Sequence, residues 1–120
     1  MHIGDVVERT GLSPKTIRDY DAAGVLHPTG RSEGGFRQYS ETDVRRLLMV
    51  RRMQPLGFSL GEASILIDAV SLVEDAGSED DVSAVRARIA AFVEDAELRR
   101  ARLVDQLAMV DELIDGLRAQ

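Results

Sequence analysis

The sequence contains no cysteine and no tryptophan in 120 residues, and aromatic residues make up only 4% of it. The absence of cysteine excludes disulfides, thiolate metal sites, iron–sulfur clusters and cysteine redox switches. No apolar run approaches the roughly 20 residues that a membrane helix needs, and Met1–Asp5 is unlike a signal peptide. These absences predict a cytoplasmic protein.

The residues that are present suit a small helical protein with an uneven charge. Hydrophobic residues make up 44% of the chain, and the scarcity of aromatics favours helices packed through aliphatic side chains. The net charge is −6, but residues 1–60 carry nine basic residues against seven acids, whereas residues 61–120 carry six against fourteen. Because nucleic-acid binding depends on local potential, only the first half is a candidate DNA-binding face.

Two short helices are predicted near the N-terminus. The apolar spacing of Ile3–Thr10 predicts the first. Ser13 is a favourable N-cap and Pro14 suits the first helical position, so a second helix begins there and runs to about Ala23. Gly24 ends it as a left-handed cap. Together the two helices form a helix-turn-helix candidate.

The following residues predict a hairpin and two more helices. Residues 27–39 hold one proline and three glycines, which favours a short β-hairpin over a helix. Capping boxes at Ser40–Asp43 and Ser59–Glu62 begin two helices, the second running through about Val73.

Basic residues in these elements indicate DNA binding. Lys15 and Arg18 are three apart and share one exposed helical face. Arg37 and Tyr39 are two apart and share one face of a strand, where both could contact phosphate. The alternatives are a solvated basic helix face and an ordinary polar hairpin. The occurrence of a basic helix and a basic hairpin one after the other favours DNA binding instead.

Ser13–Leu26, followed by Gly34–Tyr39, resembles the N-terminal domain of the MerR family of bacterial transcription regulators. The usual family form is close to T-I-R-Y-Y-E-x-x-G-L-L, then R-x-x-x-G-Y-R-x-Y, and the resemblance covers residues 3 to about 70. The chain departs from this pattern at Asp19, where an aromatic is usual, and at Gln54, a position often basic. The predicted DNA-binding residues are Lys15, Thr16, Arg18, Tyr20, Arg31, Gly35, Phe36, Arg37 and Tyr39.

The C-terminal residues predict one long helix that pairs with a second copy. Residues 74–81 are mostly acids and glycine and predict a linker, with the DNA-binding head and its connector helices at 1–73 and the coiled coil at 82–120. A helix of about 40 residues would be roughly 60 Å long, too long for a small head to cover its apolar stripe. The predicted dimerisation residues are Val85, Ile89, Phe92, Leu103, Leu107, Val110, Ile114 and Leu117. The stripe alone does not distinguish parallel from antiparallel pairing, and the resemblance implies antiparallel.

The predicted fold is mainly α, a winged helix-turn-helix head followed by a dimerising coiled-coil helix. The resemblance implies a homodimeric regulator that binds a pseudo-palindromic promoter site in double-stranded DNA and distorts the spacer between promoter elements for RNA polymerase. The competing class is an acidic coiled-coil adaptor with a weakened DNA-binding head. His2 and His27 are isolated in the sequence, so no enzyme activity, metal site or cofactor is predicted.

Overall fold

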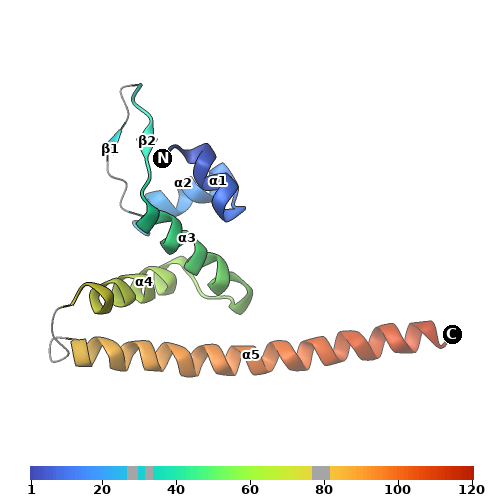
Figure 1. Cartoon of the computed structure of the whole chain (residues 1–120). Coiled ribbons are helices and arrows are strands. Elements are labelled where there is room, and N and C mark those ends of the chain that lie inside the picture. Colours follow the sequence, from blue (N-terminus) through green and yellow to red (C-terminus); the bar gives the residue numbers. More distant parts are fainter. Residues whose placement is uncertain (27–29, 32–33, 77–81) are drawn as a thin grey trace. The chain divides into compact units, whose positions relative to one another are not determined.

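The computed structural model describes residues 1–26, 30–31, 34–76 and 82–120 (Figure 1). The chain forms two compact units, Met1–Ser71 and Leu72–Gln120, and each is described by itself. Within the described ranges, no helix has both the length and the apolar character that crossing a membrane requires.

The first two helices have the predicted starts and close to the predicted ends. Helix α1 spans Ile3–Thr10 and helix α2 spans Pro14–Ala22. The Ser13 side chain accepts a hydrogen bond from the backbone N–H of Thr16 at 3.1 Å, which satisfies one of the free donors at the start of α2. Gly24 follows α2 with a φ of +81°, a left-handed conformation that glycine adopts without strain.

A short antiparallel hairpin follows α2 (Figure 1). Strand β1 is Gly30–Arg31 and strand β2 is Arg37–Gln38, with Gly30 opposite Gln38 and Arg31 opposite Arg37. This confirms the small hairpin that the glycine-rich stretch predicts. Residues 27–29 and 32–33 of that stretch lie outside the described residues.

Both predicted capping boxes are present. Helix α3 spans Glu41–Met53 and begins with reciprocal hydrogen bonds between Ser40 and Asp43, at 3.0 and 3.2 Å. A single 3-10 turn, η1 (Gln54–Leu56), follows it. Helix α4 spans Leu60–Asp75, and the side chains of Ser59 and Glu62 each accept the other's backbone N–H.

Helix α4 ends two residues beyond the expected Val73. Glu74 and Asp75 therefore belong to the helix rather than to the expected linker. Ala76 follows the helix, and residues 77–81 of that linker lie outside the described residues.

The core of the first unit joins α1, α2, α3 and α4. Buried side chains from these helices and the segments between them form one apolar cluster: Val6, Ile17, Tyr20, Val25, Leu26, Tyr39, Val44, Leu47, Val50, Met53, Ala63 and Ile67.

Arg46 of α3 adds polar connections around this core. Its Nη1 atom donates to the carbonyl oxygen of Val25, after α2, and to Asp68 of α4, both at 3.1 Å. Its Nη2 atom donates to Ser71 at 3.0 Å, and the side chain is only 11% exposed. One nearly buried guanidinium thus ties the segment after α2 to α4.

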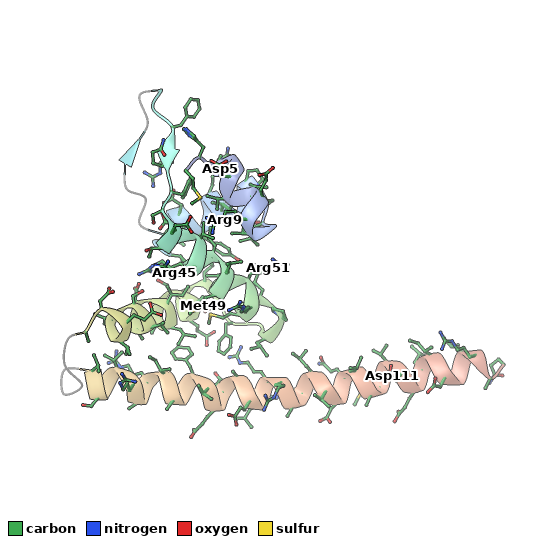
Figure 2. All side chains as sticks on the ribbon, in the orientation of Figure 1. Asp5, Arg9, Arg45, Met49, Arg51 and Asp111 are labelled. Atoms are coloured by element: carbon green, nitrogen blue, oxygen red, sulfur yellow. The ribbon has the colours of Figure 1, made fainter. Side chains whose placement is uncertain are left out.

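The second unit contains helix α5 (Ser83–Arg118), an unbroken helix of 36 residues. At 1.5 Å per residue it is about 54 Å long, which confirms the predicted long C-terminal helix. Every residue from Ala101 to Gln120 is exposed. Figure 2 shows the side chains standing out from this part of the helix, around the labelled Asp111.

Candidate nucleic-acid interface

Helix α2 presents basic side chains outward and apolar side chains inward, as the spacing predicts. Because Ser13 and Pro14 fix its start, Lys15 and Arg18 fall on exposed positions near the N-terminal end. Ile17, between them in sequence, is fully buried. This arrangement suits a recognition helix, in which cationic donors face outward from an apolar support.

Asp19 forms an ion pair with Lys15 on the same face of α2. The Lys15 Nζ atom lies 3.0 Å from an Asp19 carboxylate oxygen, at the i,i+4 spacing that helices favour. The Lys15 side chain is 85% exposed and that of Asp19 is 55% exposed, so solvent screens the pair and it contributes little to stability. The acid nevertheless offsets the lysine's charge at the helix surface.

Two other residues of α2 predicted to contact DNA are engaged within the protein. The Thr16 hydroxyl accepts a hydrogen bond from the Ser13 hydroxyl at 2.8 Å. Tyr20 lies one helical turn after Ile17 and therefore faces the core, with 6% of its surface exposed. Its hydroxyl oxygen accepts a hydrogen bond from the Gln54 side chain, which gives that departure from the family pattern a structural role.

The wing places its predicted residues in contrasting environments. Gly35 has a φ of +80° in the turn, and Phe36 after it is 67% exposed. Arg37 and Tyr39 differ in exposure: Arg37 is exposed, whereas Tyr39 is only 3% exposed. Strand β2 ends before Tyr39, whose backbone N–H donates to the Met1 carbonyl at 2.7 Å. Arg31 lies in β1, and its side chain is outside the described structure.

Asp21, near the end of α2, holds Arg37 of the wing. Arg37 Nε donates to one carboxylate oxygen at 3.0 Å, and Nη2 contacts both oxygens at 2.7 and 2.9 Å. These hydrogen bonds and the carboxylate charge raise the pKa of Arg37. The sequence analysis did not predict Asp21 as a site residue, although the family pattern has an acid, Glu, at the same position.

Residues from α1, α2 and the wing surround a hollow of about 350 Å³. Its lining residues are His2, Ile3, Arg18, Asp21, Gly35, Phe36, Arg37 and Tyr39. The ring centroids of His2 and Phe36 lie 6.4 Å apart, and the two rings meet edge to face. The sequence pattern does not indicate that His2 belongs to this site, because it is the packing of α1 that brings His2 beside the wing.

The hollow is suited to an anionic group. Arg18 and Arg37 bring positive charge from two separate elements, and Tyr39 brings a hydroxyl. Burial, together with the charge of Asp21, raises the pKa of Tyr39 above its ordinary value of 10.0. The phenol therefore stays protonated at neutral pH and remains a hydrogen-bond donor. Among the described residues, no three His, Asp or Glu side chains gather as a metal site would require.

Comparison with known proteins identifies the family. Residues 1–70 match the model of the MerR HTH family regulatory proteins. The chain belongs to the MerR family. An HTH-type transcriptional regulator of Pseudomonas aeruginosa is 45% identical over 67 residues, which are 56% of this chain and 51% of that protein. The regulator CueR of Salmonella typhi is 38% identical over 68 residues, 57% of this chain and 49% of that protein. The chain spans about half the length of the curated relatives it matches.

Solved MerR-family structures share the fold over almost the whole chain. A MerR-family regulator from Bacillus thuringiensis has a TM-score of 0.74 at 19% identity, covering 99% of this chain and 96% of that one. HiNmlR, a MerR-family regulator lacking the sensor domain and bound to promoter DNA, has a TM-score of 0.66 at 21% identity, covering 92% and 83%. At these identities the likeness establishes the fold, including the long C-terminal helix.

Proposed function

We propose that this MerR-family chain is a cytoplasmic, sequence-specific, dimeric DNA-binding regulator of transcription. The observation that carries the proposal is the convergence of Arg18 from α2 and Arg37 from the wing on one hollow. A recognition helix with an adjacent basic wing is suited to duplex DNA, the helix in the major groove and the wing on the backbone. The promoter DNA bound to HiNmlR supports the same use of this fold.

The proposed contacts come from side chains that are exposed or that line the hollow. Lys15 and Arg18 are exposed on α2 and are assigned to base edges and nearby phosphates. Arg37 and the Tyr39 hydroxyl are assigned to phosphate, and exposed Phe36 to the sugar–phosphate backbone beside them. Thr16, Tyr20 and Gly35 are assigned to supporting the helix and the wing, and Arg31 keeps its predicted contact with DNA.

Dimerisation through α5 completes the proposal. The stripe Leu103, Leu107, Val110, Ile114 and Leu117 is between 38% and 65% exposed. A second copy in an antiparallel coiled coil would cover it and supply the two-fold axis that a pseudo-palindrome requires. Two heads on one duplex could then distort the spacer between two promoter elements so that RNA polymerase can use both elements.

Alanine substitutions test the assigned contacts. The probes are a duplex selected from a random library by the wild-type protein and an unrelated duplex of equal length. Arg18→Ala should cost about 1–3 kcal/mol on the selected duplex and less on the unrelated one, since it removes base contacts. Arg37→Ala should weaken both alike and flatten the salt dependence.

Arg102→Ala, which removes an equal charge from the exposed surface of α5, is the matched control and should leave both affinities unchanged. Equal losses on the two duplexes for Arg18→Ala would reassign that residue to phosphate. An unchanged salt slope for Arg37→Ala would contradict its phosphate contact.

A protein-binding adaptor is the second candidate, and the ion pairs of the head favour it. Lys15 is paired with Asp19 and Arg37 with Asp21, which lowers the positive potential of the proposed DNA face. Chromatography on immobilised heparin distinguishes the two functions. A regulator should be retained and then eluted by salt, whereas an adaptor should flow through at low salt.

A further inference from the structure

Asp21 places a negative charge at the hollow that the proposed function assigns to a DNA phosphate. By Coulomb's law alone, a carboxylate there opposes binding. The acid is nevertheless built into the site, since its side chain is 11% exposed while that of its partner Arg37 is 43% exposed. The carboxylate thus lies behind the guanidinium, and the guanidinium lies between it and solvent.

The hydrogen bonds fix the guanidinium plane. Arg37 uses Nε and Nη2 for Asp21, so neither N–H of Nη1 is spent on the carboxylate. A two-point contact of this kind restrains both the position and the orientation of the arginine. Strand β2 carries Arg37, so the same contact also restrains the wing against α2.

We infer that Asp21 is a positioning residue for DNA binding, one that holds Arg37 and the wing where the guanidinium meets a phosphate. The inference rests on the proposed function and deepens it. Arginine side chains lose rotamer freedom on binding, and the Asp21 contact removes much of that freedom before DNA arrives. The acid therefore aids binding by ordering a cation more than it opposes binding by its own charge.

Asp19 provides a matched comparison on the same helix. It carries the same charge two residues earlier, but it contacts Lys15 through one oxygen, and both side chains are largely exposed. Its pairing links two residues within α2 and does not reach the wing. Removing the charge of Asp19 therefore reports the loss of repulsion and the release of Lys15, whereas removing that of Asp21 reports the loss of repulsion and of the positioning of the wing.

The two substitutions should change DNA affinity in opposite directions. Asp19→Asn removes a repulsive charge and should tighten binding to both the selected and the unrelated duplex. Asp21→Asn also removes a negative charge, but it should weaken binding to the selected duplex by roughly 5- to 10-fold, because the wing guanidinium loses its two-point restraint. Asp21→Glu, which restores a carboxylate, should recover part of this loss.

A double-mutant cycle with Arg37→Ala assigns the effect to the pair. In the Arg37→Ala background Asp21 has no guanidinium to position, so Asp21→Asn should no longer weaken binding. Fluorescence anisotropy with the full chain gives the four affinities, repeated at several salt concentrations. Circular dichroism melting of each variant identifies any that fail to fold, and in that event Asp21→Glu carries the test.

Several outcomes would overturn the inference. If Asp21→Asn tightens binding as much as Asp19→Asn does, the positioning role is removed. The same holds if the loss of affinity caused by Asp21→Asn persists in full in the Arg37→Ala background. Equal affinity of wild type and folded Asp21→Asn would do the same. If the wild type binds neither duplex, the proposed function itself fails, and that result is distinct from all of these.

Discussion

Leu107→Asp is the most informative perturbation of the proposed assembly, because it changes α5 and leaves every residue of the head unchanged. Leu107 lies in the middle of the exposed stripe and is 61% exposed. Leu103 and Val110, one turn to either side, are 38% and 49% exposed. A carboxylate at this position would enter the seam of a coiled coil with apolar neighbours and no evident partner.

The size of the effect follows from the exposed area. Full burial of a leucine gains roughly 1.5–3 kcal/mol, so covering the 61% that is exposed gains roughly 1–2 kcal/mol in each copy. A symmetric dimer contains the residue twice, which gives roughly 2–4 kcal/mol, or a roughly 30- to 1,000-fold rise in the dimer dissociation constant. Desolvation of the new charge adds to this loss.

Light scattering after size-exclusion chromatography at micromolar concentration measures the outcome. Leu107→Asp should shift the protein toward monomer and abolish binding to the selected duplex, while the melting transition of the head persists. Ala108→Asp is the control, since it adds the same charge at the next exposed residue, about 100° around the helix. A monomeric wild type with full affinity for the selected duplex would refute both the coiled coil and the promoter mechanism.

Three further predictions concern stability and helix direction. Arg46→Ala should lower the free energy of unfolding in urea by about 2–3 kcal/mol by removing three hydrogen bonds, whereas exposed Arg45→Ala should change it by less than about 0.5 kcal/mol. Because the pKa of Tyr39 is raised in the fold, stability should fall as pH rises above 10.0, and Tyr39→Phe should lessen that fall in alkaline urea titrations. Spin labels attached at Gln120→Cys measure the helix direction. In an antiparallel dimer whose midpoint lies at Val110 or earlier in α5, the two labels should be roughly 30 Å or more apart. In a parallel dimer they should be adjacent.

Helix starts were predictable from the sequence because their causes lie within a few residues. The capping interactions at Ser13, Ser40 and Ser59 each join a side chain to a backbone N–H three residues on. The left-handed glycine after α2 and the unbroken apolar spacing of the C-terminal helix likewise depend on residues close together in the sequence. The fold class and the outward basic face of α2 follow from these local preferences and from helical periodicity.

The detailed site could not be predicted because its decisive contacts join distant residues. Asp21 and Arg37 are 16 residues apart, and Tyr20 and Gln54 are 34 apart. The burial of Tyr39 could not be predicted either, because β2 is only two residues long and the backbone N–H of Tyr39 bonds to the N-terminal segment instead. Only the packing of α1, α2 and the wing determines which of these polar side chains meet.

The ion pairs of the head give a physical reason why dimerisation and DNA binding should be coupled. Lys15 and Arg37 are each offset by an aspartate, and within the described part of the chain Arg18 has no ion pair. A single head therefore offers few unopposed cations, and its electrostatic attraction to DNA is weak. Joining two heads makes the second contact intramolecular and multiplies weak affinities without adding contacts to either. On this reasoning Leu107→Asp should abolish specific binding although every proposed DNA-contacting residue is intact.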